Sequence, residues 1–162
     1  MNKSMTLVFA NEITFDTIPS LIDLIEKDKD KHIDLYLTSS GGGVNSGEVL
    51  TDYFNFHKLD LTLIANWSIN STAFEVFFKS TGINRRIMPN THAVIHLCRR
   101  DMSTIDITKK DTYDNFLFND VTENNERFIK FITKLGVEQK HIDRVLKGED
   151  VVLTYEELSK LL

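Results

Sequence analysis

Three side chains of this sequence have types that suit nucleophilic and acid–base chemistry, and each stands beside a predicted strand. Ser71 follows the third predicted strand and opens an apolar helix, which would place its hydroxyl beside backbone N–H groups and the positive helix end. The same position also suits an N-cap serine, the commoner use of serine there. His96 ends an apolar strand and could be a general base or a partly buried polar residue. Asp150 precedes another strand, where a lone acid usually lies on the surface.

Three consecutive glycines, Gly41 to Gly43, follow a predicted strand and precede a predicted helix. Backbone amides at such a turn point outward and can bind an anion or an oxyanion. A tight turn that needs positive φ explains the glycines equally well. No Gly-Lys-Ser/Thr follows, and the glycines are not spaced as in the dinucleotide fingerprint, so neither a phosphate loop nor that fingerprint is indicated.

The hydrophobic pattern predicts an α/β fold built from βαβ units with a largely parallel sheet. Strands are expected over 7–9, 33–38, 61–65, 86–88 and 93–97, and helices over 15–31, 44–59 and 71–80, the last ended by Gly82. A long polar helix over 112–135 follows, then a helix over 138–147 and a strand over 151–153. Phe128, Ile132 and Leu135 share one face of the long helix, which suits a partner helix or core packing. Thr154 and Glu157 form a capping-box pattern that opens a last helix.

Composition limits the classes of function. The chain has 162 residues, 41% hydrophobic and 27% charged, with a formal net charge of −5, which suits one globular domain and disfavours a general nucleic-acid binder. No apolar run reaches the roughly 18 residues of a membrane span. Cys98 is the single cysteine, and no histidine pair has metal-ligand spacing. We expect a soluble, cytoplasmic protein with no metal, no cofactor, no membrane contact and no nucleic-acid partner.

Two segments carry a family resemblance. Residues 33–44 read Ile-Asp-Leu-Tyr-Leu-Thr-Ser-Ser-Gly-Gly-Gly-Val, and residues 88–96 read Met-Pro-Asn-Thr-His-Ala-Val-Ile-His. They resemble Ile-x-Leu-Tyr-Ile-Asn-Ser-Pro-Gly-Gly-x-Val and Leu-Pro-Asn-Ser-x-x-Met-Ile-His of the ClpP family, the proteolytic subunits of Clp protease in the crotonase-like superfamily. Counting back from Pro89-Asn90 without a gap brings Ser71 onto that family's nucleophile. Residues 150–157 are similar to Asp-Arg-Phe-Leu-Ser-Ala-x-Glu, whose aspartate completes a triad.

This resemblance, over about residues 5–162, implies a single ClpP/crotonase-like α/β domain spanning 1–162. Its head would cover about 1–100 and 136–162, and its C-terminal handle-helix region about 101–135. It also implies a serine endopeptidase in which Ser71 is the nucleophile, His96 the general base, and Asp150 the group that orients the imidazole.

The resemblance assigns the rest of the site to the glycine turn and the start of the following helix. The backbone N–H groups of Gly42 and Thr72 would form the oxyanion hole. The segment Gly42, Gly43 and Val44 would pair with the peptide substrate as an added strand.

The family also implies partners. We expect a homo-oligomer built on a heptameric ring or double ring, with a peptide or unfolded protein as substrate. Because the chain begins close to its first strand, we expect the family's axial N-terminal segment to be missing. The family's docking to an AAA+ unfoldase is therefore not carried over to this chain as an expectation.

Two alternatives stay open. Thr72-Ala73 stands where the family has Met-Gly, and Ser40 replaces the usual proline, so a weak or inactive scaffold or regulatory subunit is the second hypothesis. All three triad side chains are nevertheless kept. A crotonase-like acyl-CoA enzyme is the third; its nearest catalytic acids would be Glu48 and Glu75, which are more simply interpreted as solvated helix residues.

Overall fold

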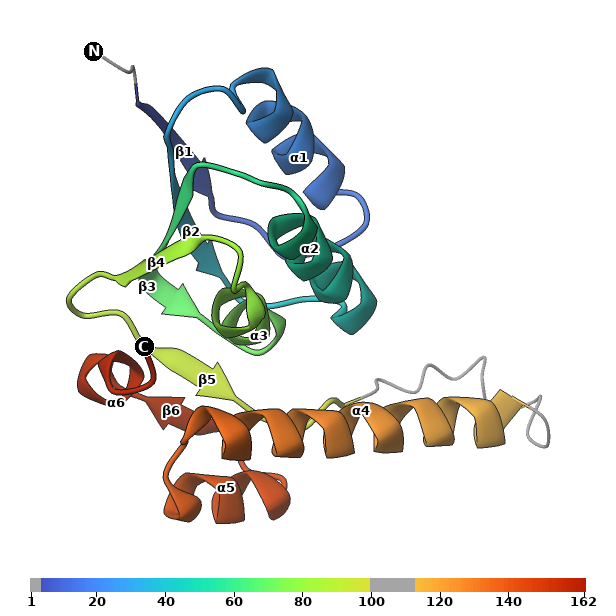
Figure 1. The fold of residues 1–162 in the computed structure, drawn as a ribbon. Coiled ribbons are helices and arrows are strands. Elements are labelled where there is room, and N and C mark those ends of the chain that lie inside the picture. Colours follow the sequence, from blue (N-terminus) through green and yellow to red (C-terminus); the bar gives the residue numbers. More distant parts are fainter. Residues whose placement is uncertain (1–3, 100–112) are drawn as a thin grey trace. The chain divides into compact units, whose positions relative to one another are not determined.

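The computed structural model describes residues 4–99 and 113–162, with side chains described for 4–99 and 121–162. The chain forms two compact units (Figure 1). The first unit consists of the chain up to Ile95 together with Val152–Lys160 and Leu162. The second runs from His96 to Val151 and includes Leu161. Residues 101–112 of the expected handle lie outside the described residues.

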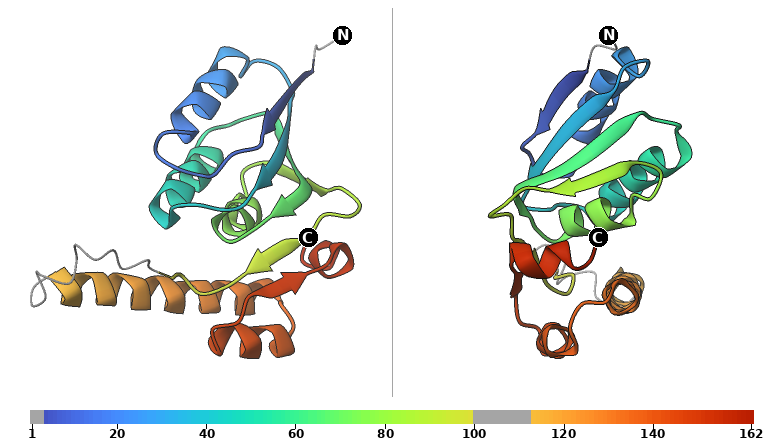
Figure 2. Two further views of the ribbon diagram at one scale, coloured as in Figure 1. Left: turned by 180° about the vertical axis from the view of Figure 1, so that it is seen from behind. Right: turned by 60° about the vertical axis from the view of Figure 1, so that its left-hand side comes forward.

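A four-stranded parallel sheet forms the centre of the first unit. Its order follows the sequence: β1 (Met5–Phe9), β2 (Ile33–Ser39), β3 (Leu61–Ile69) and β4 (Asn84–Ile87). The strands are joined by α1 (Ile18–Lys27), α2 (Val44–Phe56) and α3 (Thr72–Lys79). Figures 1 and 2 show these three helices on one face of the sheet. The predicted α/β fold of βαβ units with a parallel sheet is therefore confirmed.

Burial follows the sequence pattern in each element. Along β2 every second residue from Ile33 to Ser39 is buried, whereas residues 61–65 of β3 are all buried. A strand with a continuous apolar run is covered on both faces. Under the helices lie fully buried aromatic rings, Phe54 from α2 and Phe74 and Phe77 from α3. The core therefore sits between the sheet and the two helices that lead away from the glycine turn and from Ser71.

The third strand is four residues longer than the apolar pattern predicts, and this extension carries the chain to Ser71. The β2–β3 register shifts between Leu37 and Ser39, and Trp67 has a φ of 64°, a rare value for a bulky residue. Such irregularities bend a strand and increase its twist. The run Asn66-Trp67-Ser68 looks like a loop by composition, which is why periodicity ended the strand too early.

Two further strands form a separate two-stranded sheet. β5 (Ala93–Ile95) pairs with β6 (Val151–Leu153), and their arrows run in opposite directions in Figures 1 and 2. The last helix, α6 (Tyr155–Ser159), begins at Thr154 with the predicted capping box, which is confirmed. Helix α3 ends at Lys79, one residue before the predicted end of the 71–80 helix, and its C-cap is Ser80, so Gly82 is not the residue that ends it.

The second unit is built around α4 (Tyr113–Leu135) and α5 (Gln139–Leu146). Phe128 and Ile132 of α4 are buried, as are Ile142 and Val145 of α5. Of the two interpretations of the α4 stripe, core packing is therefore confirmed for these two residues. Within the described part of the chain, no helix combines the length and the apolar character needed to cross a membrane.

The crossing of α2 and α3 gives a test of the packing. A Cβ added at Gly47 would lie 2.2 Å from Cγ2 of buried Thr72. Overpacking costs about 1–3 kcal/mol and exceeds the roughly 0.5–1 kcal/mol that alanine gains over glycine in a helix. We expect Gly47→Ala to lower the free energy of unfolding by about 1 kcal/mol in urea titrations.

The matched double variant is Gly47→Ala with Thr72→Ser, which removes the clashing methyl group and keeps the hydroxyl. It should recover the lost stability. A single variant as stable as the wild type would contradict the tight helix crossing.

Candidate active site

Ser71 stands at a strained turn. Its φ and ψ are 52° and −122°, a combination that L-residues rarely adopt. It occupies the N-cap position of α3, yet its side chain makes no capping hydrogen bond. Within the described residues its hydroxyl has no partner. Strain of this kind is held in place by surrounding contacts and clusters at functional sites, so the simple N-cap interpretation does not account for Ser71.

Hydrogen bonds from neighbouring strands hold this turn. The Ser71 N–H donates to the Val94 carbonyl at 2.7 Å, and the Val94 N–H donates to Oδ1 of Asn70 at 2.9 Å. The Asn70 N–H donates to the Ser39 carbonyl at 3.0 Å. Asn70, one of the departures from the family's small-residue segment, thus ties the turn to β5.

The glycine loop lies directly against Ser71. A Cβ added at Gly41 would be 2.8 Å from Cβ of Ser71, and one at Gly42 would be 2.2 Å from the Ile13 carbonyl oxygen. Both glycines also have positive φ, 107° and 147°. The expectation of a tight turn with positive φ is confirmed. The close approach of Gly41 to Ser71 and of Gly42 to the Ile13 backbone gives each glycine a second reason to lack a side chain.

Two backbone donors at this junction have no acceptor within the described residues, the N–H of Gly42 and the N–H of Thr72. The neighbouring loop amides are used, because Gly41 donates to Ser39 Oγ at 3.1 Å and Gly43 to the Ile13 carbonyl at 3.0 Å. The Thr72 hydroxyl donates to the Gly42 carbonyl at 2.9 Å and so joins the loop to the helix. Free N–H groups beside a helix N-terminus suit a negatively charged oxygen.

The other two triad candidates belong to the second unit, and the structure does not pair them with each other. His96 Nδ1 lies 2.7 Å from the Leu97 carbonyl oxygen. Asp150 Oδ1 accepts from Arg99 Nη2 at 2.6 Å, and the same nitrogen donates to the Gly148 carbonyl at 3.0 Å. Both side chains of this ion pair are about half exposed. Arg99 was missed by the sequence analysis, since an arginine in a polar stretch carries no local signal of its partner.

The chain positions of His96 and Asp150 are nevertheless related. His96 follows the last residue of β5, and Asp150 precedes the first residue of β6. Because the two strands run in opposite directions, the end of one and the start of the other lie at the same end of the pair.

Metal ligands are not grouped in the part of the chain that is described: no three His, Cys, Asp or Glu side chains are placed to hold an ion.

The strain at Ser71 gives a test that does not depend on activity. Glycine adopts this conformation freely, whereas a residue with a Cβ pays about 1–3 kcal/mol. Glycine also loses more backbone entropy on folding, which offsets part of this gain. We therefore expect Ser71→Gly to raise the free energy of unfolding by about 1 kcal/mol. Ser71→Ala, which keeps the Cβ, should show no such gain. Equal stability of the two variants, in urea titrations at one chain concentration, would refute the strained turn.

Comparisons with known proteins identify the family and the fold. The family model for Clp protease matches residues 4–150. Among solved structures, the chain is similar to a ClpP1 N165D mutant from Listeria monocytogenes, with a TM-score of 0.68 and 19% sequence identity. That match covers 96% of this chain and 86% of the other. The fold is thus the ClpP fold, and the chain belongs to the Clp protease family.

Proposed function

We propose that this protein is a ClpP-type serine endopeptidase, with Ser71 as nucleophile, His96 as general base and Asp150 as the acid that stabilises the imidazolium. The observation that carries the proposal is the strained backbone at Ser71. This turn contacts the glycine loop at Gly41 and lies beside the N–H groups of Gly42 and Thr72, which have no acceptor within the described residues. Membership in the Clp protease family supports the same roles.

In the first step the Ser71 oxygen attacks the carbonyl carbon of a peptide bond, and its proton passes to Nε2 of His96. The carbonyl oxygen becomes negative and accepts hydrogen bonds from the N–H groups of Gly42 and Thr72. The bond from carbon to nitrogen then breaks, and the proton on Nε2 goes to the leaving amine. Each oxyanion donor of this type contributes roughly 10²–10³ in turnover.

In the second step water attacks the ester carbon of the acyl-Ser71 intermediate, and His96 removes a proton from it. The bond from the carbon to the Ser71 oxygen breaks, and the proton returns to that oxygen. The products are a free carboxylate and the regenerated hydroxyl.

The contacts of His96 support its role as a base. A carbonyl oxygen can only accept, so the contact with Leu97 requires the proton to be on Nδ1. Nε2 then carries the lone pair that a general base needs. The backbone leading to His96 is also held at the nucleophile's turn, because Val94, two residues earlier, is bonded to Ser71.

One edge of the glycine loop is available for pairing with a substrate. Ile13 occupies one edge of the glycine loop, since its N–H donates to Gly41 at 2.7 Å and its carbonyl accepts from Gly43 at 3.0 Å. We therefore propose that an extended peptide pairs with the opposite edge of Gly42, Gly43 and Val44. A ring-forming homo-oligomer in which the whole chain acts as one ClpP-like domain remains part of the proposal, on the strength of the family.

Removing the nucleophile tests the assignment. We expect a fluorophosphonate probe to label the wild type once, seen by intact mass, and to leave Ser71→Ala unlabelled. Ser71→Ala and His96→Ala should each lose at least about a thousandfold of peptidase turnover, because triad members act as a unit. Asp150→Asn should lose less than either.

A light-scattering mass recorded on the same samples tests the oligomer. A well-folded ring of wild-type chains that takes no label would overturn the peptidase proposal in favour of a scaffold.

The Arg99–Asp150 ion pair predicts that loss of the arginine raises the rate of catalysis. Asp150 must turn from Arg99 to His96 to act in the triad, and a half-exposed pair holds it with about 1 kcal/mol or less. We expect Arg99→Ala to raise kcat about two- to fivefold. Arg127→Ala, which removes another exposed arginine–carboxylate pair of the same unit, is the control. A kcat for Arg99→Ala that is unchanged or lower would contradict this role.

A further inference from the structure

One peptide group of the second unit is held from both sides, and one of its partners is His96. The peptide between Leu97 and Cys98 presents its carbonyl oxygen to His96 Nδ1 at 2.7 Å. The N–H of the same peptide donates to Oδ1 of Asn125, on α4, at 2.7 Å. Because a peptide N–H can only donate, the atom of Asn125 that faces it is the oxygen. Asn125 and His96 are therefore connected through a single peptide group.

Asn125 has a second contact with the same residue. Its Nδ2 lies 3.5 Å from the Cys98 carbonyl oxygen, which makes this the longer and weaker of the two contacts. Together the two contacts satisfy the donor and the acceptor of one backbone residue, as a neighbouring strand does in a sheet. Strand β5 ends at Ile95, so the backbone of Cys98 lies beyond the strand and is held by a side chain of α4.

The two bonds at this peptide reinforce each other. The imidazole N–H donates to the Leu97 oxygen, and the N–H of the same peptide donates to Asn125. Hydrogen bonds in such a chain polarise one another, so the bond to Asn125 makes the Leu97 carbonyl a stronger acceptor. A stronger acceptor favours the imidazole that carries its proton on Nδ1 and its lone pair on Nε2. Asp150 is bound to Arg99 and takes no part in this chain of bonds.

Resting on the proposed peptidase function, we propose that Asn125 is a positioning residue for His96. It fixes the peptide between Leu97 and Cys98, and this peptide holds the imidazole in the tautomer and orientation that a general base needs. While Asp150 stays in its ion pair, the peptide thus orients the histidine, as the acid of a Ser-His-Asp triad does.

Three variants separate the accepting oxygen from the rest of the side chain. Asn125→Leu removes both hydrogen bonds, and the new side chain finds apolar neighbours, because Asn125 lines a cavity of about 360 Å³ together with Leu97, Ile129 and Leu146. Asn125→Asp keeps the accepting oxygen and loses only the longer contact. Asn124→Leu makes the same change one residue earlier on α4 and is the matched control. Circular dichroism checks that each variant is folded, and Asn125→Ala replaces Asn125→Leu if the leucine variant is not.

The first test detects the tautomer and needs no turnover. Full-length protein labelled with ¹⁵N-histidine is sedimented and studied by magic-angle-spinning NMR at alkaline pH, where imidazoles are neutral. The His96 signals are assigned by their loss in His96→Gln. We expect Asn125→Leu to lower the ratio of the Nδ1–H to the Nε2–H form about fivefold, the equivalent of one hydrogen bond of ordinary strength. Asn125→Asp and Asn124→Leu should keep the wild-type ratio.

The second test separates kcat from KM in peptide cleavage. Partners that orient a histidine through its ring N–H typically contribute about 10–100-fold in metal sites. We expect Asn125→Leu to lower kcat about tenfold and to change KM less than about twofold, because an orienting group acts on the chemical step rather than on binding. Asn125→Asp should stay within about threefold of the wild-type kcat. In an Asp150→Asn background, Asn125→Leu should cost at least as much, because the peptide then orients His96 without the carboxylate.

An unchanged tautomer ratio in Asn125→Leu would overturn the proposal. So would a kcat equal to or above the wild-type value, since a rise means that the peptide keeps His96 away from Asp150. The two proposals fail in different ways. A tautomer shift in a protein that takes no fluorophosphonate label would remove the peptidase function and leave the contact of Asn125 with the histidine's peptide. Labelling and turnover that do not respond to Asn125→Leu would remove only the positioning role.

Discussion

The close packing of the glycine loop, with Gly41 against Ser71 and Gly42 against the Ile13 backbone, is the constraint on which the rest of this structure depends. No side chain fits at either glycine, because the nearest atoms belong to the Ser71 turn and to the Ile13 backbone. The parallel sheet delivers both segments to this point, since the carboxyl ends of β2 and β3 are neighbours at one edge. Helices α2 and α3 leave from the same junction, and Gly47 lets them cross closely beside it.

Departures from the family pattern are accommodated at this junction. Ala73 replaces a glycine, yet it lies inside α3 with no positive φ and is fully buried, so that position does not need a glycine. Thr72 replaces methionine and uses its hydroxyl to hold the Gly42 carbonyl. Asn70 replaces a small residue and binds the backbone of β5. These substitutions preserve a strained Ser71 by means of polar contacts.

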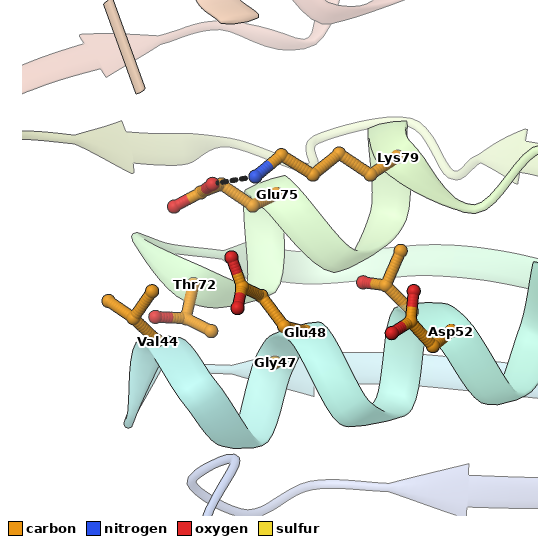
Figure 3. Close-up of a pocket in the computed structure, with 8 residues that line it drawn as sticks. Val44, Gly47, Glu48, Asp52, Thr72, Glu75 and Lys79 are labelled. Atoms are coloured by element: carbon orange, nitrogen blue, oxygen red, sulfur yellow. Dashed lines mark hydrogen bonds and ion pairs between the residues drawn. The ribbon is translucent and has the colours of Figure 1, made fainter. Parts of the chain in front are cut away.

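Two groups of charged side chains lie near the proposed site residues. Arg99 donates a hydrogen bond to the carboxylate of Asp150. The acid of the proposed triad is therefore bound to an arginine that competes with His96 for it. A cavity of about 320 Å³ between α2 and α3 is lined by the carboxylates of Glu48, Asp52 and Glu75 and by the ammonium group of Lys79 (Figure 3). Both features arise from side chains that a shared fold leaves free to vary, because the fold fixes the backbone and not the chemistry of exposed positions.

Local patterns in the sequence alone determined much of this protein. Alternating and helical periodicities predicted the βαβ order, the capping box at Thr154 predicted the start of α6, and the motifs pointed to Ser71 and the glycine loop. These signals are local, because they depend on neighbours within a few residues. Tertiary structure alone decided the strain at Ser71, the extension of β3, the burial of Phe128 and Ile132, the Arg99–Asp150 pair, and the acidic cavity. Each of these depends on residues that are distant in sequence and meet only when the strands and helices pack.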